Sequence, residues 1–184
     1  MGAGLIGIAL LFFASDLLEL AMGGLSGGQL LIQLLALLVF VPVVLALYAS
    51  QRSRLDSLGE AGALLLAASS VLLAFVSSYG LASEATGFTQ LVGSIPVVFA
   101  FAAVSAVAGA SLFSYAAYRA ELLAGWTVAI LVGGFVVGEA GHFFPGPAWA
   151  IGSLAWETGL LAIGFRLLFP AGPAEAEGLE REDL

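Results

Sequence analysis

Three side chains near one end of an otherwise apolar chain could do chemistry. His142 is the only histidine among the 184 residues, Glu139 precedes it by three positions, and Glu157 interrupts the next apolar segment. Residues three apart share one face of a helix, so Glu139 and His142 could bind a metal ion, a proton or a cation together. Helical di-iron sites use two such Glu-x-x-His pairs. A metal site here would therefore need further ligands, with Glu157 the first candidate, and the sequence identifies no cofactor.

A second acidic pair lies in the first apolar segment, where Asp16 and Glu19 are also three residues apart. Trp156 adds an aromatic ring next to Glu157. Each of these residues also has a structural interpretation: His142 as a polar anchor at the membrane interface with Glu139 hydrogen-bonded to it or to water, Glu157 as a buried helix contact, and the first pair as solvated charges. The candidate ligand- or ion-binding residues are Glu139, His142, Glu157, Asp16, Glu19 and Trp156.

The composition predicts that most of the chain is surrounded by lipid. It is 61% hydrophobic and 10% charged, whereas soluble domains carry about 25% charged residues. It contains no cysteine, which excludes disulfides and thiol chemistry. The net charge of -8 leaves no basic surface for nucleic acid. The expected partners are the lipid bilayer and, in one hypothesis, other membrane subunits or further copies of the chain.

Six apolar segments approach the roughly 20 residues that a membrane-spanning helix needs. We therefore predict an all-α fold, a bundle of six transmembrane helices within residues 1–170, with Pro145-Gly146-Pro147 joining the last two. Residues 171–184, with five acids and one arginine, are expected to form a disordered acidic tail. The expected spans are Gly4–Met22, Leu30–Ser50, Ala61–Leu81, Val92–Tyr118, Leu122–Phe144 and Ala148–Phe169.

The placement of arginine predicts the orientation in a cell membrane. With six spans, all five arginines fall on one side, and the three loops of the other side have none: 23–29, 82–90 and 145–147. Because arginine and lysine accumulate in cytoplasmic loops, both termini are expected in the cytoplasm.

The same topology gathers the acids and the histidine in the outer half of the bundle. Glu157 lies nine residues into its span, about 13 Å deep at about 1.5 Å per residue. An ionisable side chain at such a depth costs roughly 2.5–3.5 kcal/mol and is a functional candidate by default.

Six short spans with an outer pocket of Glu, His and Trp residues are similar in size and topology to the substrate-binding subunits of energy-coupling-factor vitamin transporters. The first span, GLIGIALLFFAS, lacks the A-x-x-x-A contact motif of that family. The resemblance therefore does not extend beyond size and topology.

Three hypotheses for the function remain. The first is an accessory or assembly subunit of a membrane complex, whose small-residue faces dock partner helices. The alternative is binding or transport of a cation, a proton or a small cationic solute at the outer acids and His142. The third, least favoured because no catalytic motif is clear, is a membrane enzyme or metal site using Glu139, His142 and Glu157.

Overall fold

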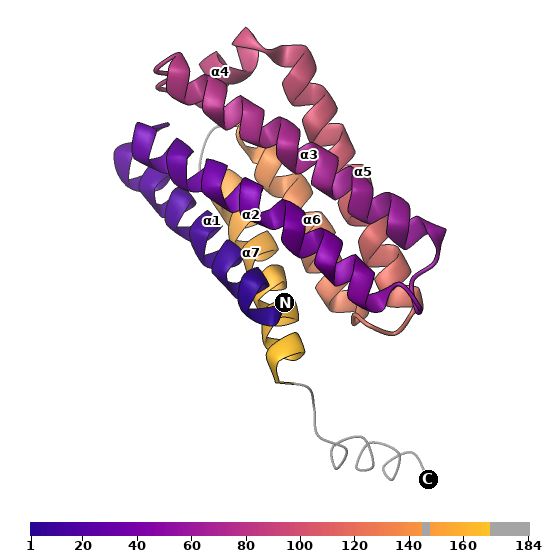
Figure 1. Ribbon diagram of the computed structural model, residues 1–184. Coiled ribbons are helices and arrows are strands. Elements are labelled where there is room, and N and C mark those ends of the chain that lie inside the picture. Colours follow the sequence, from indigo (N-terminus) through magenta and orange to yellow (C-terminus); the bar gives the residue numbers. More distant parts are fainter. Residues whose placement is uncertain (145–147, 170–184) are drawn as a thin grey trace.

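The computed structural model describes residues 1–144 and 148–169, and this part of the chain is entirely helical. The fold is a helical membrane bundle, as predicted (Figure 1). Five helices are long and apolar enough to cross a membrane, and α6, with 17 residues, is a shorter apolar helix. The helices are α1 (Gly2–Met22), α2 (Gly27–Gln51), α3 (Ser57–Ala82), α4 (Phe88–Ser94), α5 (Pro96–Arg119), α6 (Gly125–Gly141) and α7 (Ala148–Leu168).

The fourth predicted span differs most from the structure. It was expected to begin at Val92, but a separate short helix, α4, ends at Ser94 and α5 begins at Pro96. Ile95 between them has a non-helical backbone (φ −136°, ψ 51°), because a residue that precedes proline avoids the helical region. Pro96 suits the first helical position, where its missing N–H is not needed.

The fifth predicted span is longer than the helix observed there, and two other predicted segments lie outside the described residues. The helix that corresponds to the predicted span Leu122–Phe144 is α6, and it is shorter because the chain turns before it. Glu121 in this turn has a left-handed backbone (φ 56°). The Pro145–Pro147 hairpin and the acidic tail, 171–184, lie outside the described residues.

The six long helices form a closed ring. Each packs against its neighbours in the sequence, and α7 closes the ring by packing against α1. We refer to the two ends of this ring as the arginine end and the acidic end. The arginine end carries Arg52, Arg54, Arg119 and Arg166; the acidic end carries His142, the 23–26 turn and α4, which Figure 1 shows beside the ends of α3 and α5.

Glycines set the distance between α6 and α7. A side chain on Gly152 would run into the backbone of Gly138, and one on Gly134 would meet the backbone of Trp156. Small residues at such positions let membrane helices approach closely. The contact fixes the register in which Glu139 on α6 and Glu157 on α7 both point into the ring.

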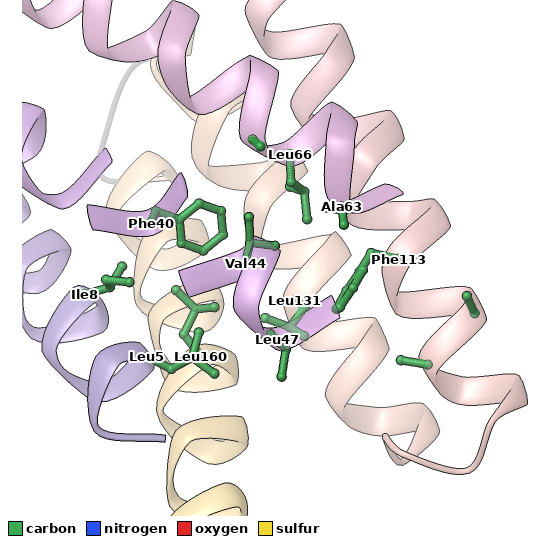
Figure 2. Close-up of a cluster of buried hydrophobic side chains, with 14 of the residues drawn as sticks. Leu5, Ile8, Phe40, Val44, Leu47, Ala63, Leu66, Phe113, Leu131 and Leu160 are labelled. Carbon is green, nitrogen blue, oxygen red and sulfur yellow. The ribbon is translucent and has the colours of Figure 1, made fainter. Parts of the chain in front are cut away.

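The apolar core is built by side chains from all six long helices (Figure 2). Ile8 is fully buried, and Phe40 is 5% exposed. Large apolar side chains also cover the outside of the ring, for example Phe101 and Ile151, as lipid contact requires. The core residues labelled in the figure are Leu5, Ile8, Phe40, Val44, Leu47, Ala63, Leu66, Phe113, Leu131 and Leu160.

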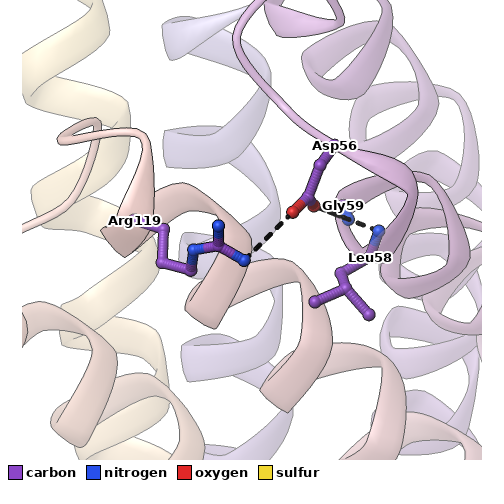
Figure 3. A network of polar contacts seen from close by, with 4 residues as sticks. All are labelled: Asp56, Leu58, Gly59 and Arg119. Atoms are coloured by element: carbon purple, nitrogen blue, oxygen red, sulfur yellow. Dashed lines mark hydrogen bonds and ion pairs between the residues drawn. The ribbon is translucent and has the colours of Figure 1, made fainter.

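Two loops are tied together at the arginine end. Asp56 caps α3 by accepting hydrogen bonds from the backbone N–H groups of Leu58 and Gly59, at 3.1 and 3.3 Å, and its other oxygen lies 3.3 Å from Arg119 (Figure 3). Arg54 donates to the carbonyl of Ala120 at 2.7 Å. Both carboxylate oxygens of Asp56 and the guanidinium groups of both arginines therefore have partners.

Candidate functional site

A cavity of about 120 Å³ lies inside the ring toward the acidic end, and we call it the acidic cavity. All six long helices and α4 contribute side chains to its wall. The structure brings every candidate residue from the sequence to this one wall, although their role in binding stays a prediction: Glu139, His142, Glu157, Asp16, Glu19 and Trp156.

Glu157 is the most unusual group in the cavity. Its side chain is buried, with the residue only 3% exposed, and neither carboxylate oxygen receives a hydrogen bond. The carboxyl of Asp16 lies beside it and beside the hydroxyl of Ser153. Two adjacent carboxylates repel one another when both are ionised, and one can donate to the other only when it is protonated. The pair therefore needs a cation or a proton from elsewhere.

Asp16 is the common neighbour of the acids in the cavity. Besides Glu157, it lies close enough to Glu19 and Glu139 to interact with both through charge. Four carboxyl groups from three helices therefore line one cavity, and among the described residues of its wall the only histidine of the chain is the sole basic side chain. The field inside the cavity favours positive charge.

Gln29 orders one side of the cavity. Its side-chain amide donates to the hydroxyl of Ser15 at 3.2 Å and to the carboxylate of Glu19 at 3.3 Å. Its own side-chain oxygen is buried and accepts no hydrogen bond from the described residues. Buried polar atoms are nearly always paired, so this oxygen and the Glu157 carboxylate together indicate room for a polar guest.

His142 lies directly after α6 and is held between two aromatic rings. It stacks on Phe88 with ring centroids 4.1 Å apart and on Trp149 at 5.0 Å. Its Nδ1 is 3.9 Å from Glu19 Oε1, too long for a hydrogen bond but close enough for a charge interaction. No hydrogen bond joins it to Glu139 within residues 1–144 and 148–169, so the two share the cavity wall without forming the expected pair.

Aromatic side chains form the apolar part of the wall. Trp156 meets Phe135 edge to face, with centroids 5.2 Å apart, and Phe40 at 6.3 Å. Aromatic faces attract cations, ammonium groups above all. The aromatic residues of the wall are Phe12, Phe40, Phe88, Phe99, Phe135 and Trp156.

The sequence analysis missed several uncharged polar residues that line the cavity. Gln29 and Gln33 are four residues apart on α2, and Ser70 and Ser77 are seven apart on α3, so each pair presents one helix face. A search for polar residues repeating at helical spacing inside apolar spans would have found Ser70 and Ser77, but Gln29 precedes the predicted span Leu30–Ser50.

The metal hypothesis gains no geometric support. Among the residues that the structure describes, no three His, Asp or Glu side chains are placed so that they could hold a metal ion. Glu139, His142 and Glu157 therefore line one cavity without converging on one point.

The chain matches no protein family, no curated protein and no solved structure. Function must therefore be inferred from the chemistry of the site itself.

Proposed function

We propose that this membrane protein binds a small organic ammonium ion in the acidic cavity. The observation that carries this proposal is Glu157, a buried carboxyl beside Asp16 whose oxygens accept no hydrogen bond. An ammonium group would supply the missing donors and the positive charge in one step.

The rest of the wall supports an organic rather than a metal cation. The donors available to a metal ion do not converge, whereas six aromatic side chains line the same cavity as the acids. A carboxylate combined with aromatic faces is the usual environment for an alkylated ammonium group, whose carbon atoms contact the rings.

The volume limits the size of the guest. A cavity of about 150 Å³ in another protein holds one benzene molecule, and the acidic cavity, at about 120 Å³, is slightly smaller. Methylammonium and its more methylated relatives match this size, whereas a vitamin does not.

The experiment is a binding titration of the purified protein by calorimetry, with methylammonium and trimethylammonium, which both keep an N–H donor, as the organic probes and sodium as the inorganic one. Glu157→Gln removes the charge at nearly constant shape and should abolish ammonium binding. Glu84→Gln is the matched control: Glu84 is an exposed carboxylate at the same end that does not line the cavity, so its loss should leave binding unchanged.

Two outcomes would overturn the proposal. One is equal ammonium affinity in the wild type and Glu157→Gln. The other is that the wild type binds no ammonium ion and that the Glu157→Gln variant is more stable against thermal unfolding than the wild type. This result would mean that Glu157 is a protonated structural group.

The orientation belongs to this proposal. If the arginine end faces the cytoplasm, as the arginine distribution favours, the termini are cytoplasmic and the acidic cavity lies toward the outside. Because the chain has no cysteine, single-cysteine variants at Gly28, where a side chain has open space, and at Gln51 test this directly. An impermeant thiol reagent applied to intact cells should label only the first.

The accessory-subunit hypothesis stays a prediction with less support. It expected a broad apolar or glycine-rich lateral face and no internal pocket. The outside of the ring is apolar, but the bundle contains the acidic cavity, and Gly134, Gly138 and Gly152 are used inside the chain, between α6 and α7. The enzyme hypothesis has no further support beyond the residues that it shares with the binding site.

A further inference from the structure

A second cavity, of about 350 Å³, lies at the arginine end, between the ends of α2 and α5, the loops that follow them, and the last turns of α7. We call it the arginine cavity. It is nearly three times as large as the acidic cavity and shares no lining residue with it.

The wall of the arginine cavity is amphipathic. Four polar side chains line it, namely Gln51, Arg54, Glu121 and Arg166. The remaining wall is apolar: Leu47, Leu55, Phe113, Ala117, Leu122, Leu123, Ile163 and Leu167.

The apolar wall continues toward the middle of the bundle. Four of its residues also line a smaller cavity of about 40 Å³, whose wall is almost wholly apolar. An extended hydrocarbon chain could therefore enter from the arginine cavity and reach into the core. The shared residues are Leu47, Phe113, Leu123 and Ile163.

We propose that the arginine cavity binds an anionic phospholipid of the surrounding membrane, with its phosphate on Arg54 and Arg166 and one acyl chain along the apolar wall. Arg54 uses one N–H on the Ala120 carbonyl, and a guanidinium has five. Arg166 has no hydrogen-bond or ion-pair partner in the described part of the chain and is free to bind the phosphate.

The charge balance indicates which phosphate fits. Two arginines and Glu121 give the wall a net charge of +1, which one phosphodiester neutralises. Basic pockets between helices on the cytoplasmic side commonly hold anionic headgroups. A free phosphate ion would leave the apolar wall unfilled, so affinity should depend on the acyl chains.

The test is native mass spectrometry of the full chain after exchange into defined lipids. Phosphatidylglycerol is compared with phosphatidylcholine of the same acyl chains, and inorganic phosphate is a third arm. We expect retained phosphatidylglycerol, little phosphatidylcholine and no phosphate adduct.

Arg166→Gln is the informative variant, because Arg54 also ties two loops together. It should weaken phosphatidylglycerol binding about five-fold, the usual contribution of one arginine near an anionic lipid surface. Arg52→Gln is the matched control, since Arg52 is an exposed arginine of the same end that does not line the cavity.

The proposal fails if the two lipids bind equally, if Arg52→Gln weakens binding as much as Arg166→Gln, or if inorganic phosphate displaces the lipid. The first outcome would mean a non-selective hydrocarbon groove, and the third an anion site without lipid. None of them bears on ammonium binding at the other end.

Discussion

The two ends of the bundle each contain a cavity, and the cavities differ in charge. Carboxylates and aromatic rings line the one at the acidic end, whereas arginines and aliphatic side chains line the one at the arginine end. Polar groups also differ in how they are paired. Asp56 and Arg119 satisfy each other at the arginine end, but Glu157 has no donor. Electrostatics therefore supports our two proposals, a cation in the acidic cavity and an anionic phospholipid in the arginine cavity.

An apolar layer separates the two cavities. The small cavity between them shares Phe40 and Trp156 with the acidic cavity and Leu47 and Phe113 with the arginine cavity. Hydrophobic constrictions of this kind exclude water and ions. If the two cavities bind ions as proposed, this layer keeps an ion at one end from crossing to the other.

The largest expected effect comes from disrupting the contact between α6 and α7. Gly152→Val places a branched side chain against the backbone of Gly138, which cannot move aside as a flexible side chain would. Overpacking typically costs about 1–3 kcal/mol and occasionally more; we expect the upper end of this range, with loss of ammonium binding. Thermal unfolding followed by size-exclusion chromatography measures the first effect and calorimetry the second.

Gly133→Ala is the control for this change, because Gly133 is on the same helix α6 with open space where its side chain would be. It should keep or slightly raise the unfolding temperature, since alanine favours a helix by up to about 1 kcal/mol over glycine. Equal loss of stability in both variants would contradict a specific α6–α7 contact.

An effect of intermediate size is expected when an aromatic ring of the acidic cavity is removed and its acids are left in place. Phe135→Leu keeps most of the apolar volume but removes a ring that lines the acidic cavity and packs on Trp156. The affinity for trimethylammonium should fall about two- to thirty-fold, since a cation–π contact contributes roughly 0.5–2 kcal/mol. Lipid retention at the arginine cavity should not change, and a change there would show that the two cavities are coupled.

The smallest effects concern the loop network at the arginine end. Arg119 and Asp56 are 56% and 44% exposed, and exposed ion pairs contribute about 0–1 kcal/mol. Arg119→Gln should therefore hardly change stability. Asp56→Ala also removes the cap of α3 and should cost about 1 kcal/mol.

Denaturation of both variants in mixed micelles measures the difference. If Arg119→Gln lowers the free energy of unfolding as much as Asp56→Ala does, the ion pair between the loops contributes more to stability than the helix cap. This result would be contrary to the geometry.

The sequence predicted the helices well, because long apolar segments bounded by Gly, Pro and Arg leave few alternatives in a membrane. It also placed Asp16, Glu19 and Glu157 in one half of the bundle, and all three line one cavity in the structure; that this half is the outer one stays a prediction. It could not predict that α4 would form, since Phe88–Ser94 is too short to show a period. Nor could it place Gln29 in the cavity, because that depends on how α2 is rotated against α1.

The most direct test compares the charge of the two cavities in one assay. Ser153→Cys places a thiol in the acidic cavity and Gln51→Cys one in the arginine cavity, each as the only cysteine of the chain. The rates of modification by methanethiosulfonate reagents carrying an ammonium or a sulfonate group are then measured, with and without methylammonium. We predict faster reaction of Cys at position 153 with the cationic reagent and protection by methylammonium, and the opposite charge preference with no protection at position 51. The same charge preference at both positions would contradict the account.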